Sequence, residues 1–225
     1  MNPKMINRVL ADPVDHLLKL LQASGSRRTV IGLVGLPGSG KSTVAARLAD
    51  EVNEQAGAGT MVALGMDGFH LTRAALAQFP DPAAALRRRG SPWTFAPAAL
   101  AARLRLLREV SLEKAAPPVM WPGFEHGVGD PVDDAVAIAP SVRLVLLEGL
   151  YLLHRSDGWN LAGLMDECGY LDVPMDVAMQ RLTARHMATW GLTQDEAVAR
   201  IAVNDQLNAL TVQASRPLAD WSVAN

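Results

Sequence analysis

The sequence has little cysteine, no strong charge of either sign and no long apolar run, and each of these absences excludes a class of protein. Cys168 is the one cysteine among 225 residues, so an intramolecular disulfide and a cysteine-based structural zinc site are both excluded. A reducing cytoplasm fits this composition best. We interpret Cys168 itself as a buried apolar thiol.

The charge and hydropathy of the chain limit the kinds of partner that the protein could bind. A formal net charge of −2 argues against a chain-wide nucleic-acid surface, although Arg87, Arg88 and Arg89 form a local basic cluster. No apolar run approaches the roughly 18 residues of a membrane-spanning helix. Charges interrupt the N-terminal segment 1–21, where a signal peptide would be apolar. We expect a soluble cytoplasmic protein, a monomer or homodimer, that binds a small anion and neither nucleic acid nor membrane.

Apolar runs typical of strands alternate along the sequence with segments of helical periodicity, as in a parallel sheet with helices on both faces. The chain is 49% hydrophobic and can bury one substantial core, which predicts a single domain over residues 1–225 with an insertion at 68–140. Strands are expected at 29–35, 61–66, within 141–153 and at 169–173, with a fifth in 209–214 or 219–225. Helices are expected around Leu17 to Leu21, at 41–54, at 97–110 and from near Pro174.

The strongest motif is GLPGSGKST, which follows the first expected strand and opens the next helix. It matches the phosphate-binding loop (Walker A) pattern, whose glycines expose backbone N–H groups to a polyphosphate at a helix N-terminus. Lys41 would reach the β- and γ-phosphates of ATP, and the Ser42 hydroxyl would ligate Mg²⁺. The predicted nucleotide-binding residues are Gly35, Leu36, Pro37, Gly38, Ser39, Gly40, Lys41, Ser42 and Thr43.

The third apolar strand ends in an acidic residue. Glu148 ends the run LVLLE, where an acid beside the phosphate loop holds Mg²⁺ directly or through water. The alternative is an ordinary strand-end glutamate. The chain lacks the N-K-x-D motif by which GTPases read guanine, so a GTPase switch is disfavoured.

Several further motifs occur in one order: MDGFHL, RRRGSPWTF, WPGFEHGVGDP, LLEGLYLL and RLTARH. Together with the phosphate loop they resemble the phosphate-loop small-molecule kinases, which include uridine kinase, phosphoribulokinase and bacterial pantothenate kinase. The branch named for a fructose transport-system kinase is the most similar. The resemblance runs from about Val30 onward. It implies a five-stranded parallel α/β sheet of the nucleotide-kinase type, with the first strand beside the third and the third beside the second, and a helical lid. Ala96 departs from the pattern, because Asp often stands there.

The resemblance gives Asp67 the role of catalytic base, taking the proton of an acceptor hydroxyl at the end of the second strand. Gly68 would leave room for the acceptor to approach. Asp67 could instead cap the following turn or help to hold Mg²⁺. His70 could pair with the substrate or with Asp67, or make a structural hydrogen bond.

Other acceptor contacts are implied by the same resemblance. Arg89 would contact substrate oxygens, the alternative being a solvated helix end. Phe124 and His126 would form part of the acceptor wall, the alternative being a rigid Pro-Gly turn. Asn208 is a further, weaker candidate for an acceptor contact.

Arg181 and Arg185 lie four residues apart, on one face of a helix. Paired arginines at this spacing are often only solvent-facing. In a kinase with a lid at about 181–200, Arg185 would neutralise charge that develops on the transferred phosphoryl group.

The sequence therefore predicts a Mg²⁺- and ATP-dependent kinase that phosphorylates a hydroxyl of a small metabolite, a sugar being favoured. A nucleoside or pantothenate kinase is the alternative among enzymes. A regulatory module that hydrolyses ATP and acts on a protein partner is the alternative of another class.

Overall fold

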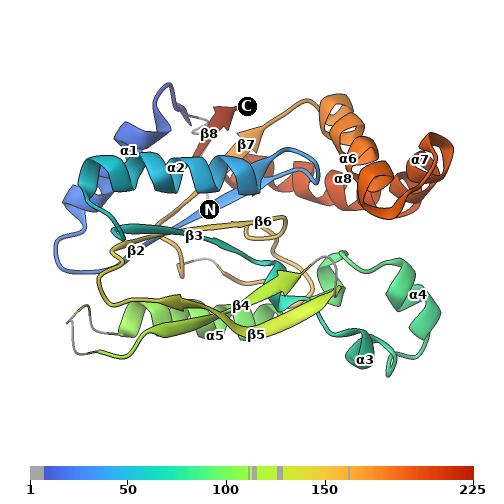
Figure 1. The fold of residues 1–225 in the computed structure, drawn as a ribbon, viewed down its shortest axis with the longest axis horizontal. Helices are drawn as coiled ribbons and strands as arrows, with labels where there is room; N and C mark the ends of the chain where they lie inside the picture. Colours follow the sequence, from blue (N-terminus) through green and yellow to red (C-terminus); the bar gives the residue numbers. More distant parts are fainter. Residues whose placement is uncertain (1–7, 111, 113–115, 126–128, 162) are drawn as a thin grey trace.

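The computed structural model describes residues 8–110, 112, 116–125, 129–161 and 163–225 (Figure 1). Its strands are β1 (Arg8–Val9), β2 (Thr29–Gly35), β3 (Met61–Gly65), β4 (Val119–Glu125), β5 (Asp130–Ile138), β6 (Leu144–Gly149), β7 (Glu167–Asp172) and β8 (Trp221–Ala224). Its helices are α1 (Pro13–Ala23), α2 (Lys41–Ala56), α3 (Arg73–Leu76), α4 (Pro82–Arg87), α5 (Pro97–Glu109), α6 (Met175–Trp190), α7 (Gln194–Val203) and α8 (Asp205–Ser215), with short 3₁₀ helices η1 (Asp67–Phe69), η2 (Pro92–Thr94) and η3 (Arg216–Leu218).

The central sheet has the order β1-β8-β7-β2-β6-β3, and every neighbouring pair is parallel. All seven residues of β2 are buried, as expected for a central parallel strand that is covered on both faces. The predicted neighbours are confirmed, because β2 pairs with β6 and β6 pairs with β3. These pairings bring the carboxyl ends of β2, β6 and β3 to one edge of the sheet.

The predicted number of strands and one alternative for the fifth strand were wrong. The sheet has six strands, because Arg8 and Val9 pair with β8 at its edge. The segment 209–214 lies inside α8, where Ala209 and Val212 are buried and Leu210 is exposed. That three-residue spacing of buried positions is helical, so the last strand is β8, within the other predicted segment.

The segment 68–140 builds the part of the molecule between β3 and β6. It contains η1, α3, α4, η2 and α5, and it ends in the antiparallel hairpin of β4 and β5. In Figure 1 the hairpin and α5 lie on one side of the central sheet and α2 lies on the other. Gly68 is buried against this hairpin, because a Cβ built there would lie 2.2 Å from the Pro122 carbonyl oxygen.

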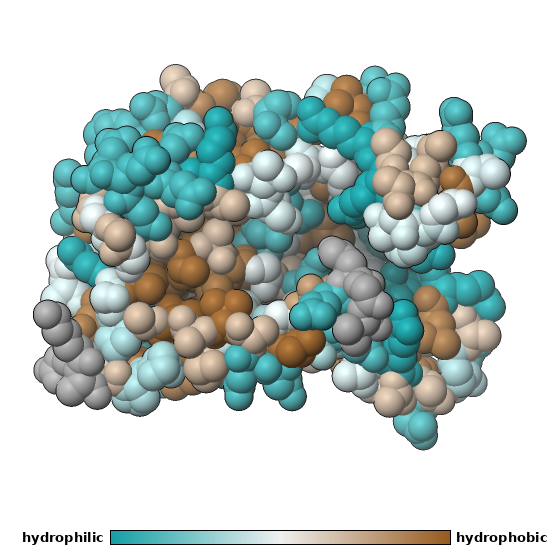
Figure 2. All heavy atoms as spheres, in the orientation of Figure 1, coloured by the Kyte–Doolittle hydropathy of each residue, from teal (hydrophilic) through white to brown (hydrophobic). Residues whose placement is uncertain are grey.

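The helices after β7 form a separate projection. Helix α6 begins after Pro174 and ends at Gly191, whose φ of 65° is the left-handed conformation typical of a helix C-terminus. Helix α7 opens with a capping box between Thr193 and Glu196, and α8 leads back toward β8. Figure 2 shows the surface hollowed between the lobe of α6 and α7 and the lobe of α3 and α4. No helix within the described residues is long and apolar enough to cross a membrane.

Candidate active site

The phosphate loop joins β2 to the N-terminus of α2. Gly38 and Gly40 have φ values of 81° and 84°, so the loop uses the left-handed conformations that glycine adopts without strain. Gly38 also allows close packing on α6, because a Cβ there would lie 2.2 Å from the Ala178 carbonyl oxygen. Helix α2 begins at Lys41, so its free N–H groups and positive dipole end face the loop. This geometry is suited to binding a polyphosphate.

Ser42 and Glu148 meet at the edge of the sheet. The Ser42 hydroxyl donates a 2.8 Å hydrogen bond to Glu148 Oε1, which connects the start of α2 to the end of β6. Burial raises the pKa of Glu148 above its ordinary value, Lys41 and the Ser42 hydrogen bond oppose that rise, and Asp67 adds to it. Ser42, next to Lys41, bonds to Glu148, and Glu148 is in register with Gly65, two residues before Asp67, so the three charged residues share one edge of the sheet.

The Ser42 hydroxyl and the Glu148 carboxylate are hard oxygen donors, the ligand type that Mg²⁺ prefers. Among the residues that the structure describes, no group of three or more His, Cys, Asp and Glu side chains could hold a metal. The Ser42–Glu148 pair fits a cation held by one or two protein oxygens together with nucleotide phosphates, which is how Mg²⁺ usually binds in kinases.

Asp67 begins η1 directly after β3, and Gly65 at the end of β3 is in register with Glu148. The Asp67 side chain is half-buried at the same edge as the phosphate loop. The expectation that Gly68 leaves room for an acceptor was wrong, because Pro122 of the hairpin occupies the space where a Gly68 side chain would lie. The glycine serves to seat η1 on β4.

His70 is held by the main chain and by two aromatic rings. Its Nδ1 lies 2.8 Å from the Asp67 carbonyl oxygen, and since a carbonyl only accepts, Nδ1 carries the proton. The centroid of the His70 ring lies 3.9 Å from that of Phe95 and 4.8 Å from that of Phe124. The structure thus brings His70 and Phe124 together beside Asp67, and the histidine bonds to the Asp67 backbone.

Arg89 makes several protein contacts at once. Its guanidinium donates to the carbonyl oxygens of Gly129 and Leu71, at 2.9 Å for Leu71, and to Asp130 Oδ1 at 2.7 Å. It also lies 5.6 Å from the centroid of the Phe124 ring. Arg89 is therefore no solvated helix end, and a contact with substrate stays a prediction. His126 lies outside the described residues.

The two arginines of α6 differ in their surroundings. Arg181 Nη1 donates to the Ser39 carbonyl oxygen at 3.3 Å, so Arg181 reaches the back of the phosphate loop. Arg185 is exposed on the same helix. Asn208 is buried, and its Oδ1 accepts from Ser91 Oγ at 3.2 Å and from Arg88 Nη2 at 3.5 Å. Its place as an acceptor contact also stays a prediction.

Sequence reasoning missed two residues, one at the phosphate loop and one beside the segment that carries Arg89. Asn225 Nδ2 donates to the Ser39 carbonyl oxygen at 2.9 Å, and nothing in the local sequence marks this residue. The Tyr151 hydroxyl donates to the Gly90 carbonyl oxygen at 2.6 Å, which ties the connection after β6 to the segment that carries Arg89. The aromatic residue three positions after Glu148 was the available signal for Tyr151.

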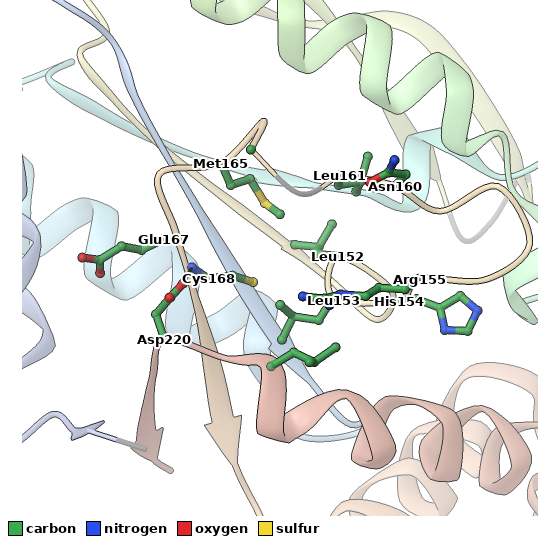
Figure 3. A pocket seen from close by; sticks show the side chains of 12 residues that line it. Leu152, Leu153, His154, Arg155, Asn160, Leu161, Met165, Glu167, Cys168 and Asp220 are labelled. Carbon is green, nitrogen blue, oxygen red and sulfur yellow. Dashed lines mark hydrogen bonds between the residues drawn. The ribbon is translucent and has the colours of Figure 1, made fainter. Parts of the chain in front are cut away.

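A pocket of about 180 Å³ lies away from this edge of the sheet (Figure 3). It is bounded by the connection after β6 and by the start of β7, and Leu152, His154, Cys168 and Asp220 are among its lining residues. The Cys168 side chain is buried, so its interpretation as a buried apolar thiol is confirmed, and burial raises its thiol pKa. The phosphate loop does not contribute to this pocket.

A parallel sheet in this strand order, a phosphate loop after its central strand and an acid at the end of the neighbouring strand define a P-loop protein of the nucleotide-kinase type. The profile of the phosphoribulokinase / uridine kinase family matches residues 30–211, and the chain belongs to that family.

Individual relatives agree with this assignment. A Schizosaccharomyces pombe protein named "Putative uridine kinase C227.14" is 37% identical over 190 residues, which cover 83% of this chain and 79% of the relative. The "ATP-dependent kinase-like protein notR'" of Aspergillus versicolor is 46% identical over 147 residues, covering 64% of this chain and 84% of the relative. The chain is an ATP-dependent kinase of this family.

A solved structure extends the likeness to the whole fold. The structure of a "putative fructose transport system kinase" from Silicibacter sp. TM1040 superposes with a TM-score of 0.80 at 31% identity, covering 93% of this chain and 97% of that one. The predicted resemblance to that branch is confirmed.

Proposed function

We propose that the protein transfers the γ-phosphoryl group of Mg-ATP to a hydroxyl group of a small metabolite, with a sugar as the favoured acceptor. The observation that carries this proposal is the convergence of Lys41, Glu148 and Asp67 at one edge of the sheet, where Ser42 bonds to Glu148 and Glu148 pairs with the end of β3. One cation and two acids at the end of a phosphate loop supply what phosphoryl transfer needs: charge neutralisation on the phosphates and a group that takes the acceptor proton.

Each residue has a defined part in this reaction. Lys41 and the N-terminus of α2 hold the phosphates, and Ser42 and Glu148 would hold Mg²⁺, which when bound neutralises charge on the phosphate oxygens. Asp67 takes the proton from the acceptor hydroxyl, which then attacks the γ-phosphorus as the bond to ADP breaks. Arg185 is carried by α6 and approaches the phosphates on lid closure, as a group that stabilises the transition state.

The acceptor side supports a small polar substrate with an aromatic wall. His70, Phe95 and Phe124 stack beside Asp67, and the Arg89 guanidinium lies over Phe124. Stacked rings next to hydrogen-bonding groups are typical of sites that bind compact molecules with both apolar and hydroxyl surfaces. Sugars, nucleosides and pantothenate all meet that description.

A phosphorylation screen tests the proposal directly. The protein is incubated with Mg-ATP and with sugars, polyols, nucleosides, pantothenate and glycerate in turn, and the product mass is read. A mass gain of one phosphate on one acceptor, abolished in Lys41→Ala, supports the proposal. ATP turnover that responds only to added protein, and to none of these alcohols, would favour the regulatory ATPase instead.

A further inference from the structure

The Arg88–Ser91 turn joins three parts of the molecule. The Ser91 N–H donates to the Arg88 carbonyl oxygen at 2.9 Å, and Gly90, with φ of 103°, occupies the third position. A turn with positive φ at its third residue favours glycine there. Because the backbone reverses tightly, Arg88 and Arg89 send their side chains to different neighbours.

Arg88 binds the junction of α7 and α8, which we call the lid stem. Its Nη1 donates to the carbonyl oxygen of Val203, the last residue of α7, at 2.7 Å, and its Nη2 donates to Asn208 Oδ1 in α8 at 3.5 Å. A cation at a helix C-terminus complements the dipole of that helix. The junction of α7 and α8 is bound to the same turn a second time, since Asn204 Nδ2 donates to the Arg89 carbonyl oxygen at 3.0 Å.

Arg89 binds the acceptor side. Its guanidinium contacts Gly129 and Asp130 at the start of β5, and the Leu71 carbonyl oxygen just after the segment that begins with Asp67. The side chain is only 14% exposed, so this is a partly buried network whose members constrain one another. The Arg89 side chain therefore connects the hairpin to the segment that carries the proposed base.

The turn is also attached to the strand that carries Glu148. The Tyr151 hydroxyl donates to the Gly90 carbonyl oxygen at 2.6 Å, and Tyr151 is 1% exposed. Tyr151 is thus a fixed support within the core. The turn is thus attached to the core through Tyr151, to the lid stem through Arg88 and Asn204, and to the hairpin through Arg89.

We propose that the Arg88–Ser91 turn couples lid closure to the ordering of the acceptor side, with Arg88 as the positioning residue. This inference rests on the proposed function, since it requires a lid that closes over a nucleotide. When α7 and α8 move with the lid, the hydrogen bonds of Arg88 and Asn204 displace the turn in the same direction. Arg89 then transmits this displacement to Gly129 and Asp130. Coupling of this kind is reciprocal, so an acceptor that orders the hairpin also favours the closed lid.

Amide hydrogen exchange with a non-hydrolysable Mg-ATP analogue tests the coupling without a known acceptor. In the wild type, we expect the analogue to slow exchange in the phosphate loop, in α6 and α7, and also in β5, by roughly fivefold or more in β5, the low end of usual coupling factors. In Arg88→Gln, the phosphate loop and α6 should still respond, while the response of β5 is lost. Arg88→Lys keeps a donor to Val203 and should retain part of it.

Arg87→Gln is the matched control, because the Arg87 side chain is exposed and makes no hydrogen bond or ion pair within the described residues. It should respond as the wild type does. A β5 response that is absent in the wild type, or equal in wild type and Arg88→Gln, overturns the coupling. So does a β5 that exchanges faster in Arg88→Gln with its response to nucleotide intact, because that marks a merely structural role. A phosphate loop that gains no protection in the wild type would instead overturn the proposed function on which the coupling rests.

Discussion

The Asp67 carboxylate has three possible roles, and one substitution separates them. Asp67→Asn keeps the size of the side chain but removes the proton acceptor, so for a catalytic base kcat should fall by roughly 10²- to 10⁴-fold with Mg-ATP affinity almost unchanged. A metal ligand would instead raise the Mg²⁺ concentration needed for half activity. A capping residue would leave the chemistry intact, because asparagine caps nearly as well as aspartate. Single-turnover rate, Mg²⁺ titration and ATP affinity are the measurements.

Glu148 should make the protein less stable at neutral pH than it would be without the charge. Burial raises the pKa of this carboxyl, so the folded state binds its proton more tightly than the unfolded state does. Stability contributed by the protonated form is therefore present at low pH and lost as pH rises from 4.5 through the folded pKa. Glu148→Gln keeps the hydrogen-bonding shape without the charge.

The variant should accordingly show a higher free energy of unfolding near pH 7 and a flatter profile above pH 4.5 than the wild type, measured by urea denaturation. Its Mg²⁺-dependent activity should fall at the same time. Equal stability of the two proteins across this range would show that Lys41 and Ser42 fully offset the burial of Glu148.

At the scale of single elements, helix α6 carries two arginines with different expected effects. Arg185 is exposed and is proposed to reach the phosphates only in the closed state, so Arg185→Ala should lower kcat more than it weakens ATP binding. Arg181 already donates to the Ser39 carbonyl oxygen, so Arg181→Ala should loosen the phosphate loop and weaken ATP binding. Isothermal titration and steady-state kinetics on the pair make the comparison. The reverse pattern would exchange the two roles.

Helix α6 and its neighbours should also lose stability in mild acid through His186. Burial, Arg185 and Arg200 lower the pKa of His186 to about 4 from 6.5, so the unfolded chain takes up this proton before the folded chain does. Its contribution is complete above pH 6.5 and is lost as pH falls toward 4. His186→Phe keeps a ring beside Trp190 and does not titrate, so its unfolding free energy should fall less across that window.

Asp205 in α8 also faces His186, with Nε2 to Oδ2 at 3.9 Å. Burial raises the pKa of the Asp205 carboxyl, which therefore titrates in the opposite sense at the acid end of the range. Both proteins contain Asp205, so the difference between their unfolding curves isolates the histidine. Parallel curves would show that His186 does not titrate differently in the folded state.

At the scale of the whole molecule, Mg-ATP should bridge the sheet edge and the lid and so stabilise the entire fold. A ligand at one hundred times its Kd adds about 2.7 kcal/mol to the stability of the state that binds it. Thermal unfolding with and without Mg-ATP measures this, and Lys41→Ala should lose most of the shift. A large shift that persists in that variant would place the nucleotide away from the phosphate loop.

The parts of this fold that could be predicted are those whose signals are local. The largely apolar β2, the glycines at 38 and 40 and the acid near the end of β6 each reflect one segment, and each stands where the sequence predicted it. Strand β1 has only two residues, both exposed, so no periodicity in the sequence could predict it. The five-stranded expectation failed for that reason.

The contacts of the acceptor side depend on segments far apart in the sequence. Arg89 meets Gly129 and Asp130 only because the hairpin folds back over η1, and no pattern around Arg89 records that. Asn225 reaches Ser39 through the order of β8 and β7 in the sheet. Residue type and motif predicted that Lys41, Asp67 and Glu148 lie at one edge of the sheet, and tertiary packing decided which neighbours each candidate residue contacts.

The Arg88–Ser91 turn also limits how the sequence can change over evolutionary time. Arg88 donates to Val203 and to Asn208, and Asn204 donates back to the Arg89 carbonyl oxygen, so replacing Arg88 or Asn204 removes a hydrogen bond between the turn and the α7–α8 junction. We expect these positions to be exchanged together in related chains, while the exposed Arg87 beside them varies alone. A lineage that acquires a new acceptor can then alter the aromatic wall at His70 and Phe124 residue by residue, but can alter the turn only as a unit.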